Sequence, residues 1–215
     1  MRRLVMASLV VGTLQLASGT RAVAAPEGHE SAAVPAAVAL RQSMRKLWSD
    51  HAFWTREYIV AAVAGGPDQA AAAGRLMRNQ EDIGAAIAVY YGDAAGAKLT
   101  SLLKEHIAIA VDLIKAAKAG DTAGRQRADV AWHQNGEDIA AFLSQANPNW
   151  PRPIMVEMMN THLSTTTDEV VARLTKDWDK DVRAFDAVYE HLLHMSDVLS
   201  DGIIAQFPAR FERDR

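Results

Sequence analysis

The sequence predicts an all-α protein, a six-helix bundle built from three pseudo-repeated helical hairpins of about 56 residues. Three observations lead to this prediction. Alanine is abundant while β-branched runs are scarce, apolar residues recur at spacings of three and four, and clusters of Gly and Pro interrupt the pattern. No stretch alternates between apolar and polar residues as a strand does.

The first 24 residues have the pattern of a secretory signal peptide. Arg2 and Arg3 precede a short apolar stretch, and residues 22–24 (Ala-Val-Ala) fit a small-x-small cleavage site. This apolar stretch is shorter than the roughly 20 residues that a spanning helix needs, and no later stretch is long enough. We therefore expect cleavage after Ala24, a periplasmic or secreted bacterial protein, and no membrane span.

The mature chain is acidic and has no cysteine. Residues 1–24 carry three arginines and no acid, so their removal moves the formal charge from −3 to −6. An acidic chain argues against nucleic acid as a partner. The absence of cysteine excludes disulfides, thiolate metal sites and thiol catalysis.

One bundle domain is expected over residues 38–207, between a flexible leader over 25–37 and a tail over 208–215. Breaks rich in Gly, Pro and Asp divide this domain, and the strongest, at 147–153, holds three prolines that cannot continue a helix. The weakest break lies at 175–179. The expected helices cover residues 38–64, 68–90, 94–119, 122–145, 154–174 and 179–206.

Histidines recur in the first helix of each hairpin. His51, His106 and His162 are 55 and 56 residues apart, and each shares a helical face with apolar residues. At 1.5 Å per residue, each lies roughly 20 Å from the turn of its hairpin. We expect the three imidazoles to point inward at one height.

A second polar signature recurs in the second helices. NQEDIG (79–84) and NGEDIA (135–140) start 56 residues apart and place an Asn opposite the histidine of the same hairpin. In the third hairpin we align His194 with the Asn position, although strict spacing would select His191 instead. The same alignment matches three acids, Asp82, Asp138 and Asp197, which we expect to face the histidines.

These inward polar groups have two competing interpretations. In the first, His51, His106, His162 and His194 bind a divalent transition metal ion such as Zn, Cu, Fe or Ni, with the three aligned acids as further ligands or hydrogen-bond acceptors. In the second, the polar groups satisfy one another and only fix the register of the helices. A small organic ligand is a further alternative, held by Asn79 and Asn135 between aromatic walls that include Trp54 and Tyr58.

Several stretches resemble an uncharacterised family of exported bacterial all-helical proteins: LWSDHAFWTREYI (47–59), LMRNQEDIGAAI (76–87), YYGDAAGAKLTSLLKEHI (90–107), FLSQANPNWP (142–151) and DGIIAQFPARF (201–211). The resemblance covers nearly all of the mature chain and implies a single exported domain. Members are sometimes labelled glycosyltransferase. Residues 177–179 do read Asp-Trp-Asp, but at a helix start this Asp-x-Asp pattern is typical of capping.

The sequence thus favours a non-enzymatic binding protein for a metal ion or small ligand, with no identified protein partner. A structural or protein-interaction module is the alternative. An enzyme such as a glycosyltransferase ranks third, because no nucleophile–base motif or phosphate-binding loop is present.

Overall fold

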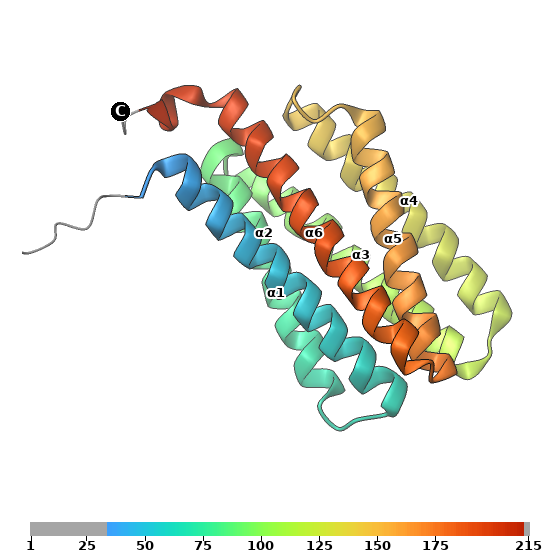
Figure 1. Cartoon of the computed structure of the whole chain (residues 1–215). Coiled ribbons are helices and arrows are strands. Elements are labelled where there is room, and N and C mark those ends of the chain that lie inside the picture. Colours follow the sequence, from blue (N-terminus) through green and yellow to red (C-terminus); the bar gives the residue numbers. More distant parts are fainter. Residues whose placement is uncertain (1–33, 213–215) are drawn as a thin grey trace, which may run out of the picture. The chain divides into compact units, whose positions relative to one another are not determined.

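The structure, a computed structural model, describes residues 34–212, which form six long helices (Figure 1). The helices are α1 (Ala36–Ala64), α2 (Gln69–Tyr91), α3 (Asp93–Ala119), α4 (Thr122–Ala146), α5 (Arg152–Thr175) and α6 (Trp178–Gln206), followed by a 3₁₀ turn, η1 (Pro208–Arg210). No strand occurs within residues 34–212, so the prediction of an all-α six-helix bundle is confirmed. The predicted signal peptide, most of the leader and the last three residues of the tail lie outside the described residues.

Each helix begins and ends within two residues of its predicted bounds. The first helix, α1, begins at Ala36, which is two residues before its predicted start and inside the predicted leader. Pro35 occupies the position before the helix, and the two alanines that follow favour helical structure. The internal repeat of hairpins stays a prediction at this level, because the arrangement of six helices does not by itself show it.

Glycine and aspartate end and begin the helices as the sequence indicates. Gly65 and Gly120 end α1 and α3 in the left-handed conformation, with φ of 73° and 69°. The Asp121 carboxylate accepts a hydrogen bond from the Gly124 amide at the start of α4. Asp177 accepts one from the Lys180 amide at the start of α6, which confirms the capping interpretation of the Asp-x-Asp pattern.

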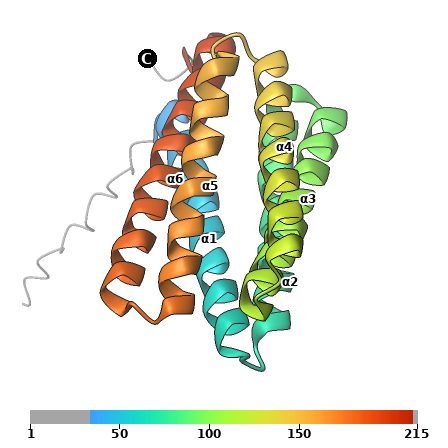
Figure 2. The same cartoon turned by 90° about the vertical axis from the view of Figure 1, so that its right-hand side faces the viewer.

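The six helices form a closed ring. Each packs against its neighbours along the chain, and α6 packs back against α1 (Figures 1 and 2). Successive helices run antiparallel, so α1, α3 and α5 share one direction (Figure 2). Helix α1 also contacts α3 and α5. The three helices that carry the predicted histidines therefore meet inside the ring.

The apolar core is divided along the length of the bundle. Its largest cluster draws on all six helices and includes Met44, Ile83 and Trp150. Two smaller clusters, centred on Ile59 and on Leu163, lie further along the helices. Helices α2 and α3 approach closely at Gly84, where an added methyl group would overlap the Thr100 hydroxyl. Within residues 34–212, no helix is both long and apolar enough to cross a membrane.

Candidate functional site: a buried histidine layer

The three predicted histidines converge in the interior. His51 on α1, His106 on α3 and His162 on α5 expose only 2%, 3% and 5% of their surface. The ring centroid of His162 lies 5.8 Å from that of His51 and 5.8 Å from that of His106. On its other side, His191 of α6 stacks on His162 at 6.3 Å. We call these four residues the histidine layer.

One hydrogen bond recurs in all three hairpins. The side chains of Asn79, Asn135 and His191 donate to the carbonyl oxygens of Leu47, Leu102 and Met158, at 3.0, 3.1 and 2.9 Å. Each of these carbonyls belongs to the residue four positions before the histidine of the same hairpin. The donors are separated by 56 residues each. This recurrence supports the predicted repeat and gives His191, not His194, the Asn position.

The histidines of the first two hairpins use their amide neighbours differently. The Asn135 side-chain nitrogen donates to Leu102, so its oxygen accepts the Nδ1–H of His106 at 2.8 Å. In the first hairpin, the nitrogen facing His51 Nδ1, at 3.2 Å, belongs to Gln80 rather than Asn79. The second copy has Gly136 at the position of Gln80. Because the Asn135 oxygen accepts the Nδ1–H of His106, this ring is the tautomer that carries a free lone pair on Nε2.

Two imidazole nitrogens in the layer lack partners. His106 Nε2 and His162 Nδ1 are buried and form no hydrogen bond with any described residue. The indole nitrogen of Trp132, which packs against His106 at 5.2 Å, is also unpartnered. A buried polar atom without a partner costs about 1–3 kcal/mol. The layer thus contains two buried ring nitrogens whose hydrogen-bonding capacity the described residues do not use.

Burial keeps the layer neutral. Desolvation lowers the pKa of His51 and of His106 to about 4, although the neighbouring amides favour the charged form. Burial and the adjacent imidazoles hold the pKa of His162 well below its ordinary value, and burial also lowers the pKa of His191. All four rings are therefore uncharged at pH 7, the state in which imidazole ligates metal ions.

The layer separates two small cavities, each of about 30 Å³. His51, His106 and His162 line both of them. The first cavity, toward the turn ends of the hairpins, is also lined by Thr55, Tyr58, Thr166 and Thr167. The second cavity adds Trp48 and the methionines Met44, Met159 and Met195. Either space exceeds the roughly 10–15 Å³ that one water molecule needs.

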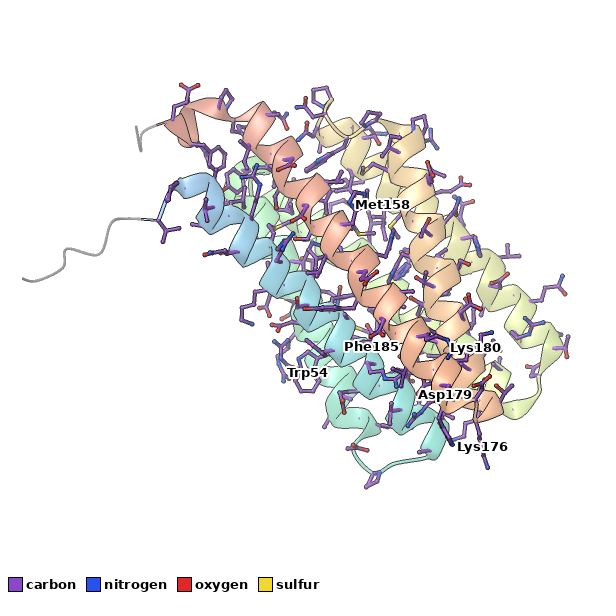
Figure 3. All side chains as sticks on the ribbon, viewed as in Figure 1. Trp54, Met158, Lys176, Asp179, Lys180 and Phe185 are labelled. Atoms are coloured by element: carbon purple, nitrogen blue, oxygen red, sulfur yellow. The ribbon has the colours of Figure 1, made fainter. Side chains whose placement is uncertain are left out.

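The predicted ligand-binding residues separate into two groups. Asn79 and Asn135 are buried and support the histidines, but they do not line either cavity. Tyr58 lines the first cavity, and its hydroxyl accepts a hydrogen bond from Gln69 at 3.4 Å. Trp54 lies beside α1 and α2 on the side away from α5 (Figure 3), where the Arg75 guanidinium covers its ring. The prediction that Trp54 forms a wall of the site is wrong.

The aligned acids and His194 do not reach the layer, so the prediction that they face inward is wrong. Asp82, Asp138 and His194 are exposed, and Asp197 pairs with Arg45 at the surface. Asp82 and Asp138 each come three residues after an inward asparagine, which rotates them about 60° toward the edge of the buried stripe. Asp197 comes six residues after the inward His191, which rotates it about 120° away. A carboxylate there remains in water because its burial without a cation is costly.

Sequence reasoning assigned no role to two residues of the site, His191 and Gln80. The signal for His191 was the strict 56-residue spacing from Asn79 and Asn135, which the looser alignment on His194 set aside. The sequence gives no such signal for Gln80, because Gly136 occupies its position in the second hairpin and has no side-chain amide.

A second buried polar cluster joins α1, α5 and α6. Arg56 donates to Glu169 at 2.8 Å and forms two hydrogen bonds to Asp181 at 2.5 and 2.7 Å. Arg173 donates to Asp181 at 2.8 Å. Burial would raise the pKa of Asp181, but the hydrogen bonds from both arginines outweigh it and hold that pKa below its usual range. Burial raises the pKa of Glu169, whose second oxygen has no partner. We call this the arginine–carboxylate cluster.

Comparison with protein-family models, with curated proteins and with solved structures found no match to this chain. The resemblance to an exported family therefore stays a prediction.

Proposed function

We propose that this protein is an exported binding protein that holds a transition metal ion in its histidine layer, between His51, His106 and His162. The observation that carries the proposal is the pair of buried, unpartnered nitrogens on His106 and His162. Neutral imidazole nitrogens are the commonest protein ligands for Zn, Cu, Ni and Fe. The N-terminal sequence supports a periplasmic or secreted location.

The ring spacing fits a shared ion. A metal–nitrogen bond of about 2.0–2.1 Å places an imidazole centroid about 3 Å from the ion, so two liganding rings have centroids about 5–6 Å apart. The observed separations of His162 from His51 and His106 are both 5.8 Å. As the rings stand, no three His, Asp or Glu residues within 34–212 form a ready metal-binding group. Loading therefore calls for rotation of the imidazoles, while the helices keep their positions.

The supporting hydrogen bonds also suit a metal site. Asn135 holds His106 through Nδ1 and leaves Nε2 free, which is the usual way that a neighbouring acceptor orients a liganding histidine. His191 donates from Nε2 to the Met158 carbonyl and stacks on His162. These contacts leave His106 Nε2 and His162 Nδ1 without partners, so both nitrogens are available to the proposed ion.

A matched pair of histidine variants tests the proposal. The exported protein is purified and its metal content measured, first as isolated and then after loading with Zn, Cu, Ni or Fe. We expect one ion per chain in the wild type and a higher melting temperature, since ligand at 100 times Kd stabilises by about 2.7 kcal/mol. His162→Ala should lose the ion. The exposed His194→Ala should keep it.

The outcome that contradicts the proposal is a helical wild-type protein that takes up no ion under any loading. Equal metal content in His162→Ala and His194→Ala would contradict it as well. Circular dichroism of both variants establishes that the comparison is made between folded proteins.

A structural or protein-interaction module is the second candidate. The observation in its favour is the recurring bond from Asn79, Asn135 and His191 to a carbonyl of the facing helix, which fixes the register of each hairpin. Loss of metal binding in every test would leave this role as the better account of the layer. Glycosyl transfer gains no support from the Asp-x-Asp pattern, because Asp177 caps α6.

A further inference from the structure

We infer that the ion taken by the histidine layer is Cu(I), with thioether sulfur from the second cavity completing its coordination. The inference rests on the proposed metal-binding function and deepens it. Met44 on α1, Met159 on α5 and Met195 on α6 line that cavity together with His51, His106 and His162. Three thioethers and three imidazoles thus border one enclosed space.

Only the second of the two cavities is lined by methionine. Three methionines line it, whereas the first cavity has none and is lined by threonine and tyrosine residues instead. Met44, Met159 and Met195 come from three different helices and are 1%, 7% and 4% exposed. Thioether is a soft ligand that suits Cu(I), and imidazole also binds copper, whereas the usual protein ligands of Zn are Cys, His, Asp and Glu.

The charge of the site points in the same direction. Among the described residues, neither cavity is lined by Asp or Glu, and imidazole ligates a metal ion in its neutral form. An ion placed there receives no compensating charge. Because the Born cost of desolvation rises with the square of the charge, a monovalent ion pays about a quarter of the cost of a divalent one. The buried carboxylates Glu169 and Asp181 do not offset this, since arginines already neutralise them.

Methionine is also an ordinary filler of apolar cores, and the chain provides controls for that role. Met155 and Met158 are buried in the same cluster, at 2% and 7% exposure, but line neither cavity. Met158 lies between α5 and α6 (Figure 3), where its carbonyl accepts the bond from His191. Substitution of these two residues changes packing without removing sulfur from the site.

The test measures Cu(I) and Zn(II) affinity of the exported protein under anaerobic conditions, by competition with chromophoric chelators. The variants are the triple Met44→Leu, Met159→Leu, Met195→Leu and the control double Met155→Leu, Met158→Leu. Leucine keeps nearly the same volume, so both proteins should fold. We expect the triple variant to weaken Cu(I) binding by about tenfold to 100-fold, the range seen when support of a metal site is lost. Zn(II) affinity should be unchanged.

X-ray absorption at the copper edge provides the second measurement and should show a sulfur neighbour in the wild type that the triple variant lacks. Equal Cu(I) affinity in the triple and double variants, or a copper spectrum without sulfur, would overturn the inference. In that case, ion uptake that still depends on His162 leaves the proposed function intact. A wild type that binds neither Cu(I) nor any divalent ion overturns the proposed function together with the inference.

Discussion

The histidine layer and the arginine–carboxylate cluster lie about two helical turns apart on α5, at His162 and Glu169, and the bundle stabilises them by opposite means. In the cluster, three hydrogen-bonded ion pairs keep the groups charged and nearly every polar atom has a partner. In the layer, burial keeps the groups neutral and two nitrogens stay without partners. A network in which only Glu169 Oε2 among the carboxylate oxygens lacks a partner suits a structural role, whereas spare buried nitrogens suit a ligand.

The two regions should respond to acid in different pH ranges, and the layer should show the largest effect. His51 and His106 have pKa values of about 4 in the folded state against about 6.5 when unfolded. Their contribution to stability is complete above pH 6.5 and is lost as the pH falls toward 4. The difference between the folded and unfolded pKa values corresponds to about 3 kcal/mol for each residue. Urea unfolding at pH 7, 5 and 4 measures the loss.

The variant His106→Gln separates this effect from other titrations. It should retain more of its stability between pH 7 and 4 than the wild type does. Asp181 has a lowered pKa, so its own contribution disappears only below the usual carboxyl range. A pH dependence that is identical in wild type and variant would show that protonation of the layer does not govern acid stability.

Breaking the arginine–carboxylate cluster should produce the next largest loss. Arg56→Ala leaves Glu169 without a cation and removes two of the three bonds to Asp181. Removal of one partner from a buried ion pair typically costs about 3–5 kcal/mol. The urea midpoint at pH 7 measures this change.

Arg45→Ala is the matched control for that experiment. Arg45 also forms a double contact with a carboxylate, that of Asp197, but the two side chains are 53% and 32% exposed. An exposed pair contributes about 0.2–1 kcal/mol. Equal losses of stability in Arg56→Ala and Arg45→Ala would mean that burial of the cluster does not increase its contribution to the free energy of unfolding.

The smallest effects should distinguish the two carboxylates of the cluster. Asp181 accepts three hydrogen bonds and has a lowered pKa, so Asp181→Asn should cost about 1.5–3 kcal/mol, the range for bonds to charged groups. Burial raises the pKa of Glu169, whose ionised form is therefore held less well, and Glu169→Gln should cost under about 1 kcal/mol. Thermal unfolding at pH 7 compares the two. A larger loss for Glu169→Gln would reverse this assignment of roles.

Local signals in the sequence predicted the helices and half of the site. The sequence shows where the helices are interrupted, at Gly65, at Gly120 and in the proline-rich stretch 147–153. These breaks predict the bounds of the helices. His51, His106 and His162 share faces with apolar residues, so their burial followed as well. Similarity between the copies misplaces Asp197 and His194, because it takes no account of the direction in which each side chain points on its helix.

The arginine–carboxylate cluster could not be predicted from one sequence. Arg56 and Asp181 are 125 residues apart, and neither belongs to a repeated signature. Their pairing depends on the return of α6 to α1, which periodicity alone does not reveal. The same limit applies to Met44, Met159 and Met195, since a methionine on a buried face gives no sign of the cavity that it borders.

Closure of the ring has a consequence for the order in which the protein folds. Arg41 on α1 and Asp201 on α6 form an ion pair across 160 residues of sequence, whereas most of the other helix contacts join neighbours along the chain. Long-range contacts form late, because the entropy of closing a long loop is lost before they form. Docking of the last helix on the first is therefore expected as the final step. A chain shortened before α6 would leave one edge of α1 uncovered and its apolar side chains open to association with other chains.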